Sequence, residues 1–278
     1  MFFNNYISKK LSFYRTKHIF QHYKDFKSIE ELKKLINFSV KNKKNYIILG
    51  NGSNVFFANN FIKTVILKNE IPETIIEKGN GLIEVSSSVK TMNLLKYCYK
   101  KDYDCFYFLS SVPSTIGGNI AMNAGNGKFS NQFISNYIVS LKVFDGKKIF
   151  SLKKNEINFK YRESKFSGKN NLFIISALFR FKNKKIKINP IKERLIWAKK
   201  YQDYSAPNCG SVFRDRYSFI MFLLGGIKIF GTEFSPKTQN WILNKSENTK
   251  GIKTLIFLCR VFHLIFFKIA KLEIIKIK

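Results

Sequence analysis

A run of small and hydroxyl-bearing residues in the middle of the chain limits the folds that the chain can adopt. It reads Ser110-Ser111-Val112-Pro113-Ser114-Thr115-Ile116-Gly117-Gly118-Asn119 and leads into Met122-Asn123-Ala124-Gly125-Asn126-Gly127. Side chains this small let the main chain lie flat against a large ligand, and glycine lets it turn tightly. The run is too polar for a core and too ordered in composition for a linker. It predicts a cradle for a pyrophosphate or a flavin, with a glycine-rich surface loop as the alternative.

A second glycine loop, Gly50-Asn51-Gly52-Ser53-Asn54, comes directly after the apolar run Tyr46-Ile47-Ile48-Leu49. Its two glycines expose successive backbone N–H groups in a concavity suited to a phosphate, and Ser53 and Asn54 add side-chain donors. The third glycine and the following helical pattern of a Rossmann fingerprint are missing. Taken alone, the loop is better explained as a plain turn.

Two shorter motifs carry polar side chains suited to chemistry. In Tyr161-Arg162-Glu163-Ser164-Lys165-Phe166, the arginine can clamp a carboxylate through two parallel hydrogen bonds, or can lie on the surface beside an ordinary aromatic. In Asn208-Cys209-Gly210-Ser211-Val212-Phe213, a glycine places a serine at a turn. No Ser–His–acid arrangement is readable, but Ser211 remains a candidate proton donor.

Length and composition exclude several classes of protein. The 278 residues are 45% hydrophobic and 16% aromatic, which excludes disorder and leaves room for two or three domains. The four cysteines are too few for a disulfide scaffold and have no CxxC spacing, so we expect no metal site.

The charge is strongly positive: 49 Lys and Arg against 18 Asp and Glu give a formal net charge of +31. Such a charge indicates a polyanionic partner, either nucleic acid or an anionic membrane. However, the chain is rich in Lys, Asn, Ile and Phe, the residues of A- and T-rich codons, and its lysines are scattered over every segment. We favour codon drift and expect no nucleic-acid partner, because no compact basic block or RNA-binding signature is present.

Residues 1–10 contain no apolar core of a secretory signal. The most apolar stretch, Leu255 to Phe267, has thirteen residues and includes Arg260 and His263, which is short of the ~20 apolar residues that a bilayer requires. We therefore expect a buried or amphipathic helix there, no membrane insertion, and a cytoplasmic protein.

Periodicity predicts an α+β chain with mixed strands in both halves. Ser28-Ile29-Glu30-Glu31 is a capping box that opens a helix reaching about Lys41. We expect strands at residues 46–49, 64–67, 82–86, 137–144 and 172–181, helices at residues 92–100 and 191–200, and a short tail strand. The lysine-rich stretch 182–190 ends in Asn-Pro and suggests a domain boundary, with domains at residues 1–185 and 186–278.

In this order, the four motifs resemble those of the UDP-N-acetylenolpyruvoylglucosamine reductases, the flavoprotein reductases of peptidoglycan precursor synthesis. The shared features are the glycine loop after a strand, Pro-x-Thr-x-Gly-Gly running into Met-Asn-Ala-Gly, Tyr-Arg-x-Ser-x-Phe, and Gly-Ser-Val-Phe. A fifth motif, Phe234 to Asn244, is similar to the family's Val-Ser-x-x-His-Ala-Asn-Phe-Ile-Val-Asn. Five motifs in register are a specific signal.

The resemblance implies an FAD-binding half of the vanillyl-alcohol-oxidase type in two α/β subdomains, residues 1–185, followed by a smaller α/β substrate-binding domain, residues 186–278. It also implies that NADPH reduces FAD, which passes a hydride to the enolpyruvyl group to give UDP-N-acetylmuramate. The partners would be NADPH and the UDP-sugar, and the protein would be a monomer. The implied FAD site comprises Gly50, Asn51, Gly52, Ser53, Asn54, Ser110, Ser114, Thr115, Gly117, Gly118, Asn123, Ala124 and Gly125.

For catalysis, the resemblance implies that Arg162 faces the substrate carboxylate and that Ser211 donates the proton. The third family residue is a glutamate in a C-terminal Leu-Glu-x-Glu-Val pattern, of which only Glu273 is present. Ungapped spacing places Ile275 on the catalytic position, whereas a two-residue deletion places Glu273 there, and we favour Glu273. Substrate contacts are implied for Tyr161, Lys199 and Arg214.

The chain departs from the family at several positions. Ser111 and Ser114 replace two glycines, Arg214-Asp215-Arg216 replaces Lys-Asn-Pro, and Thr238 replaces a histidine. These changes suggest a reduced, fast-evolving copy. Two alternatives stay open: another flavoprotein oxidase of the same fold, against which the Arg162 and Ser211 motifs argue, and a decayed basic nucleic-acid-binding protein.

Overall fold

The computed structural model describes residues 2–168 and 171–278. Two compact units are present, and each is assembled from separated segments of the chain. Unit 1 consists of Met1–Tyr23, Gly52–Val65 and Ala198–Lys278, and unit 2 of Lys24–Asn51 and Ile66–Trp197. These units differ from the expected functional domains, residues 1–185 and 186–278, and that division by function stays a prediction.

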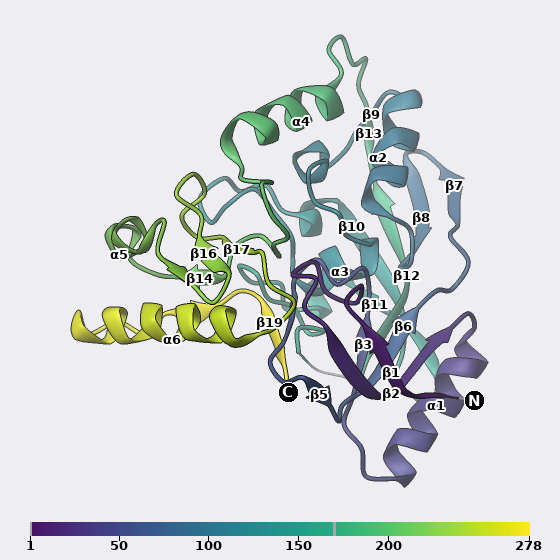
Figure 1. The fold of residues 1–278 in the computed structure, drawn as a ribbon. Helices are drawn as coiled ribbons and strands as arrows, with labels where there is room; N and C mark the ends of the chain where they lie inside the picture. Colours follow the sequence, from purple (N-terminus) through teal and green to yellow (C-terminus); the bar gives the residue numbers. More distant parts are fainter. Residues whose placement is uncertain (1, 169–170) are drawn as a thin grey trace. The chain divides into compact units, whose positions relative to one another are not determined.

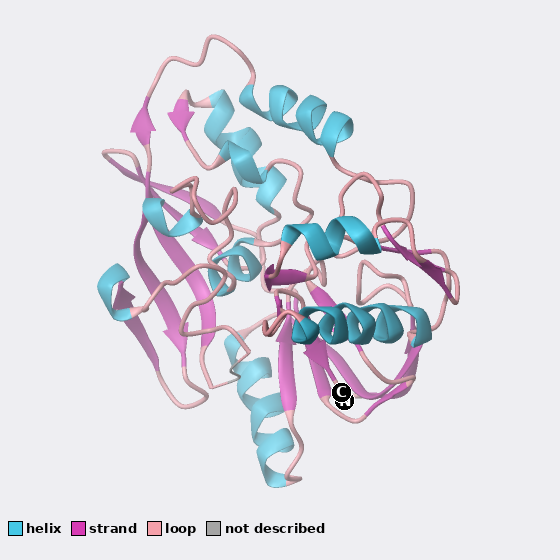
Figure 2. Ribbon diagram, turned by 90° about the vertical axis from the view of Figure 1, so that its left-hand side faces the viewer, coloured by secondary structure: helices cyan, strands magenta, loops and turns pink. Residues whose placement is uncertain are grey.

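Unit 2 contains a five-stranded antiparallel sheet in the order β11-β10-β12-β8-β7. Its strands are β7 (Ile75–Gly79), β8 (Leu82–Ser86), β10 (Ile138–Phe144), β11 (Ile149–Lys153) and β12 (Phe173–Arg180). Figure 2 draws the strands of the protein in magenta. The predicted strands 82–86, 137–144 and 172–181 are confirmed to within a residue at each end. The two unpredicted strands, β7 and β11, lie at the sheet edges, where mostly exposed side chains leave no apolar run to detect.

The helices α1, α2 and α4 begin within a residue of where the sequence predicts them, whereas the short helix α3 was not predicted. α1 (Ile29–Lys41) is capped by Ser28, whose Oγ accepts a hydrogen bond from Glu31 N at 3.1 Å. The Glu31 carboxylate accepts from Lys27 N at 2.7 Å, one residue before the position that a capping box uses. The other helices are α2 (Thr91–Lys100), α3 (Ile116–Ala121) and α4 (Pro190–Tyr201), the last of which continues into unit 1.

The remaining elements of unit 2 are short. They are β3 (Tyr46–Leu49), β6 (Val65–Asn69), the antiparallel pair β9 (Tyr103–Asp104) and β13 (Lys182–Asn183), and the 3₁₀ turns η1 (Tyr107–Leu109), η2 (Ile134–Tyr137) and η3 (Lys154–Glu156).

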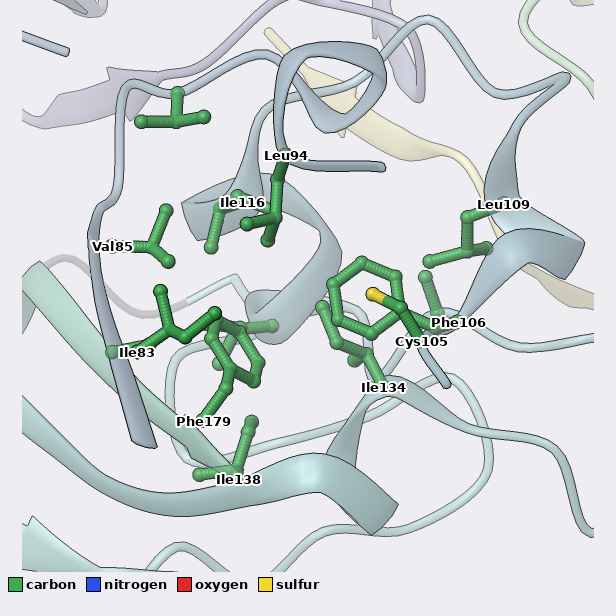
Figure 3. Packing of buried hydrophobic residues seen from close by; sticks show 14 of the residues in the cluster. Ile83, Val85, Leu94, Cys105, Phe106, Leu109, Ile116, Ile134, Ile138 and Phe179 are labelled. Atoms are coloured by element: carbon green, nitrogen blue, oxygen red, sulfur yellow. The ribbon is translucent and has the colours of Figure 1, made fainter. Parts of the chain in front are cut away.

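The core of unit 2 anchors the short helix α3. Ile116 of α3 points into the same cluster as Val85 of β8 and Leu94 of α2, and all three side chains are fully buried (Figure 3). Phe106 and Phe179 pack in this cluster with ring centroids 5.5 Å apart. Because this core holds α3 in place, the residues just before and after α3 have a defined position.

Unit 1 is made of small sheets. β1 (Phe3–Ser8) pairs antiparallel with β2 (His18–Phe26), which pairs parallel with β5 (Phe61–Ile62). β15 (Lys228–Ile229), β16 (Thr232–Phe234) and β17 (Ile242–Asn244) form a three-stranded antiparallel sheet. The predicted tail strand is two strands: β18 (Lys271–Leu272) pairs with β14 (Phe213–Asp215), and β19 (Ile275–Ile277) runs parallel to β4 (Val55–Phe57).

Two helices complete unit 1, namely α5 (Ser218–Leu224) and α6 (Lys250–Ile265). The predicted apolar helix at 255–267 is therefore confirmed, but it begins five residues earlier and ends two residues earlier. One face packs into the core of unit 1, with Ile252, Leu255, Ile256, Cys259 and His263 buried. In the described part of the chain, no helix has the length and apolar character needed to cross a membrane.

Candidate active site

The Ser110–Gly118 loop of unit 2 is held by a network of hydroxyl and amide groups. Thr91 Oγ1 lies 2.9 Å from Ser114 Oγ and accepts a hydrogen bond from Asn119 Nδ2 at 2.7 Å. Thr115 caps α3 by accepting from Gly118 N at 3.3 Å. These bonds use polar side chains that would otherwise be unsatisfied in a buried loop, so they fix the loop in one conformation.

The two predicted cofactor loops meet inside unit 2. Asn51 Nδ2 donates to Pro113 O at 2.7 Å, which joins positions 62 residues apart. A Cβ on Gly50 would lie 2.6 Å from Thr115 Oγ1, and one on Gly117 would lie 2.8 Å from Ser87 Cβ. These glycines are therefore required by close packing of the loops on their neighbours. The predicted Ser110 is different, because its buried hydroxyl donates to Tyr107 O at 2.7 Å and caps η1.

The segment after α3 contains a buried acceptor with no partner. Asn123 has a left-handed φ of +41°, and its Nδ2 donates to Lys160 O at 2.9 Å. Its Oδ1 is buried without a hydrogen bond. Gly125 is also closely surrounded, since a Cβ there would overlap Gln132 O and the Phe133 ring. A flat cofactor that offers an N–H group would satisfy Asn123, so the residues present fit such a ligand.

The three remaining loop residues, Gly52, Ser53 and Asn54, lie in unit 1. Gly52 has a φ of +72°, and a Cβ there would overlap Leu11 O. Asn54 Nδ2 donates to Glu273 O at 3.2 Å, and Ile275 N donates to Asn54 O at 2.9 Å. Asn54 therefore binds the C-terminal segment, a contact that nothing in the spacing of residues 54 and 273 predicts.

Arg162 lies in a tight turn of unit 2. Lys160 and Glu163 exchange backbone hydrogen bonds of 2.9 and 3.2 Å across it, and Arg162 has a φ of +55°. The left-handed region costs a residue with a Cβ about 1–2 kcal/mol. Strain of this kind is concentrated at functional sites. The guanidinium Cζ lies 5.4 Å from the centroid of the Tyr161 ring.

The Arg162 turn is tied to the end of α3. Ser164 Oγ donates to Ala121 O at 2.7 Å, and Lys160 O accepts the bond from Asn123 already described. Tyr161 packs edge-to-face on Phe133, with ring centroids 6.4 Å apart. The structure thus brings together Arg162, Tyr161 and the Asn123–Gly125 segment, a contact that the separate motifs did not predict.

Ser211 and Glu273 approach each other in unit 1. Ser211 forms an isolated antiparallel bridge with Trp241. Glu273 N donates to Val212 O at 2.8 Å, so the backbone of Glu273 is bonded to the residue next to Ser211. Ile275, the alternative position, instead pairs with Val55 of β4. The geometry therefore favours Glu273 over Ile275 as the residue beside Ser211.

Asn240 holds Val212 and Phe213, the two residues directly after Ser211. Its backbone O accepts from Val212 N at 2.8 Å, its Oδ1 accepts from Phe213 N at 3.1 Å, and its Nδ2 donates to Phe213 O at 2.8 Å. The side chain is buried, so these bonds are shielded from water. Sequence reasoning matched Asn240 to a family motif without a role.

Asp203 is a second residue that the sequence did not single out. Ser235 Oγ donates to its Oδ2 at 2.6 Å, and the Ser205 hydroxyl donates to its Oδ1 at 2.7 Å. Burial raises the pKa of Asp203, but these hydrogen bonds and Lys237 hold it below its ordinary value. Ser235 also accepts from Thr238 N at 2.8 Å. The sequence signal that could have identified Asp203 is an Asp two residues before a Ser, which is the pattern of an Asx turn.

The predicted substrate contacts Lys199 and Arg214 also lie in unit 1. Lys199 is exposed near the end of α4, and its backbone O accepts from Lys237 Nζ at 3.0 Å. Arg214 is half-buried in β14.

Burial raises the pKa of the Cys209 thiol to about 11, so this cysteine is protonated at neutral pH and is a poor nucleophile. No cluster of three potential metal ligands occurs among the described residues.

Comparisons with known proteins agree with this site. A family model described as FAD binding domain matches residues 21–148. The chain is 34% identical to the UDP-N-acetylenolpyruvoylglucosamine reductase of Prochlorococcus marinus subsp. pastoris, over 82% of this chain and 80% of the relative. It is 30% identical to the enzyme of that name from Chlamydia felis, over 86% and 82%.

The fold matches a solved structure along almost its whole length. The crystal structure of UDP-N-acetylenolpyruvylglucosamine reductase from Thermus caldophilus superposes with a TM-score of 0.79, covers 97% of both chains and is 18% identical in sequence. The expected α+β flavoprotein fold with an FAD-binding region is thus confirmed, and FAD is its cofactor.

Proposed function

This chain belongs to the UDP-N-acetylenolpyruvoylglucosamine reductase family, and we propose that it reduces the enolpyruvyl group of that sugar nucleotide to give UDP-N-acetylmuramate. The observation that carries the proposal is sequence identity of 30% or more over at least four fifths of both chains. The proposed catalytic residues are Arg162, Ser211 and Glu273. NADPH is the proposed reductant, and the proposed compartment is the cytoplasm, where four free and buried thiols fit a reducing environment.

FAD, when bound, supplies the carrier that accepts and delivers the hydride. In unit 2, the Gly50–Asn51 and Ser114–Gly118 loops and the Asn123–Gly125 segment would hold it. The support is the packed glycines, which bring the backbone close to its surroundings, and the unpaired buried Oδ1 of Asn123. The family resemblance also assigns FAD contacts to Gly52, Ser53 and Asn54, which lie in unit 1, and we keep these as proposed cofactor residues.

Arg162 is proposed to bind the carboxylate of the substrate. Hydride addition to the enolpyruvyl double bond places negative charge on the carbon beside that carboxylate. A fixed cation stabilises this charge more strongly as it develops, which lowers the barrier. The tight turn, the positive φ and the ties to Ala121 and Asn123 keep the Arg162 backbone in place before the substrate arrives.

Ser211 is proposed to donate the proton that completes the reduction. A carbanion-like intermediate is a strong base, so a hydroxyl of ordinary acidity suffices. Glu273 is proposed as the third catalytic residue, and its backbone bond to Val212 supports this choice over Ile275. Tyr161, Lys199 and Arg214 are proposed to contact the substrate, and the cations suit its diphosphate.

We further propose that residues 1–185 serve mainly to bind FAD and residues 186–278 to bind substrate. Each set supplies part of the proposed chemistry, with Arg162 in the first and Ser211 and Glu273 in the second. The enzyme is proposed to act as a monomer on its two small-molecule substrates, with no nucleic-acid partner.

The test is to separate the two half-reactions in Ser211→Ala and Glu273→Gln. NADPH should still bleach the flavin absorbance in both variants, whereas reoxidation by the enolpyruvyl sugar nucleotide should slow by at least about 100-fold. Two exposed residues of unit 1, Ser218 and Glu247, provide the matched controls Ser218→Ala and Glu247→Gln, which should reoxidise at the parent rate.

Three outcomes would contradict the proposal. A purified protein that stays colourless and takes up no added FAD would not be a flavoprotein. Peroxide formation without NADPH oxidation would indicate an oxidase. Parent-like reoxidation in Ser211→Ala would remove Ser211 as the proton donor.

A further inference from the structure

The helix α6 is apolar on two faces, and only one of them is buried. Along the second face, Phe257, Val261, Leu264 and Ile265 recur at helical spacing, and the described chain leaves them open to solvent. Phe257 is 64% exposed and Ile265 is 63% exposed. An apolar stripe on a helix of a globular protein normally packs against another element. Contiguous exposed apolar surface of this kind marks a binding surface.

The exposed surface continues onto α5 and the turn after α6. Figure 1 shows α5 beside one end of α6, and the Phe219 and Phe266 rings meet edge-to-face with centroids 5.0 Å apart. Phe222 and Leu223 of α5 are exposed, and Phe267 in the turn is 100% exposed. We call the set of Phe222, Leu223, Phe257, Leu264, Ile265 and Phe267 the α5–α6 face.

The charges around the α5–α6 face are all of one sign along α6. Between Asn248 and Leu272 the chain has five Lys and Arg residues and no Asp or Glu. Arg260 and Lys271 are exposed, and Lys268 pairs with Asp215 at 2.9 Å. A second copy of this chain would place the same cations opposite one another, which is unfavourable. The basic flanks therefore favour an anionic partner.

The chemistry of the face distinguishes between anionic partners. Its six members are phenylalanine, leucine and isoleucine, without a hydrogen-bonding group, whereas protein interfaces mix apolar contacts with polar ones. Exposed apolar side chains flanked by Lys and Arg are the pattern of helices that lie in the interface of an anionic bilayer. We propose that the α5–α6 face docks on the surface of an anionic phospholipid bilayer.

The contact is peripheral, because no described helix could span a bilayer. It goes beyond the expected absence of membrane insertion, since the apolar side chains would enter only the interface. It is also separate from the proposed reductase activity: α5, α6 and the following turn contain none of the proposed catalytic or cofactor residues.

The experiment measures sedimentation of the FAD-loaded protein with vesicles. We expect binding to phosphatidylcholine vesicles that contain phosphatidylglycerol, and not to phosphatidylcholine alone. The triple variant Phe257→Ser, Ile265→Ser, Phe267→Ser should bind at least about tenfold more weakly. Phe129→Ser is the matched control, because Phe129 is 94% exposed but lies in unit 2. Unchanged flavin absorbance in each variant reports an intact fold.

A charge series separates a local surface from general attraction by a basic protein. Arg260→Glu with Lys271→Glu should weaken binding strongly. Lys33→Glu with Lys34→Glu, on the exposed side of α1, makes the same change in net charge and should have a small effect. Equal losses in the two pairs, equal binding to both kinds of vesicle, or full binding by the triple variant would overturn the proposal. So would a dimer in light scattering that the triple variant converts to a monomer.

Discussion

Gly117 and Gly118 are neighbours in the proposed FAD cradle but differ in what surrounds them. A Cβ on Gly117 would lie 2.8 Å from Ser87 Cβ and 3.1 Å from Ser87 O, both closer than ordinary contact. A Cβ on Gly118 would meet only Thr115 Oγ1, at 3.4 Å. The first glycine is therefore required by packing, while the second position has room for a methyl group.

We predict that Gly117→Ala lowers the free energy of unfolding of the apoprotein by about 1–3 kcal/mol, because the added methyl group must displace the Ser87 backbone. Gly118→Ala should leave it nearly unchanged and instead weaken FAD binding. Denaturant unfolding and titration with FAD measure the two effects. Equal destabilisation by both alanines would show that the contact with Ser87 is not what requires glycine.

The motifs indicated which segments carry the candidate site, but they did not predict the hydrogen bonds that each side chain makes. Residues 114–118 form a loop and the first turn of α3, consistent with their small side chains, whereas no motif predicted the tight turn at Arg162. Ser110 and Asn54 instead bind backbone carbonyls, of Tyr107 and of Glu273. The second bond joins residues 219 positions apart, and no local pattern encodes such a pairing.

Among the secondary-structure elements, β14 is short and depends on a side chain from elsewhere. Phe213 pairs with Leu272 of β18, and the Asn240 side chain adds further backbone bonds by both donating to Phe213 O and accepting from Phe213 N. Ser211 and Val212 directly precede β14, and Val212 O accepts the backbone hydrogen bond from Glu273 N. Asn240 is therefore a positioning residue for the proposed proton transfer.

We predict that Asn240→Ala slows reoxidation of the reduced flavin by substrate at least about tenfold, while flavin reduction by NADPH is unchanged. Loss of two buried hydrogen bonds should also lower the free energy of unfolding by about 1–3 kcal/mol. Asn240→Asp keeps the acceptor for Phe213 N and should recover part of the rate. Asn37→Ala, on the exposed side of α1, is the control, and equal slowing of both half-reactions in Asn240→Ala would contradict a positioning role.

Elements with a strong local signal were predictable and the others were not. The capping box located α1, and short segments rich in apolar and β-branched residues located β8, β10 and β12. β2 was missed because its buried residues, such as Phe20, Tyr23 and Phe26, recur every third position and do not alternate. β14 and β18 are three and two residues long, and their pairing depends on contacts between distant segments.

Two buried histidines, His263 and His18, make the stability of the protein depend on pH. His263 is fully buried, and its Nε2 accepts from Tyr217 N at 2.9 Å while Nδ1–H donates to Cys259 O at 2.7 Å. This arrangement requires the neutral ring. Burial lowers the pKa of His263, and Lys268 and Arg216 lower it further, against the opposing effects of Cys259 O and Asp215. Burial likewise lowers the pKa of His18.

These shifts set the sign of the pH dependence. A histidine whose pKa is lowered by folding binds fewer protons in the folded protein than in the unfolded chain, so its contribution to stability is present above the unfolded pKa, near 6.5, and is lost as the pH falls below it. We predict that the free energy of unfolding falls between pH 7 and pH 5.5, by up to about 1.4 kcal/mol per pH unit for each such histidine. Urea unfolding at a series of pH values measures the slope.

His263→Gln and His18→Gln should each reduce that slope, even though each substitution also lowers stability at neutral pH. His22→Gln is the control, because His22 is only partly buried in β2 and its Nδ1 bonds to Asn4 Oδ1 at 3.0 Å. Its slope should match the parent's. Since the formal net charge is +31, repulsion between positive charges also grows on acidification, but it grows equally in all three variants. A parent-like slope in His263→Gln would therefore exclude His263 as a source of the acid sensitivity.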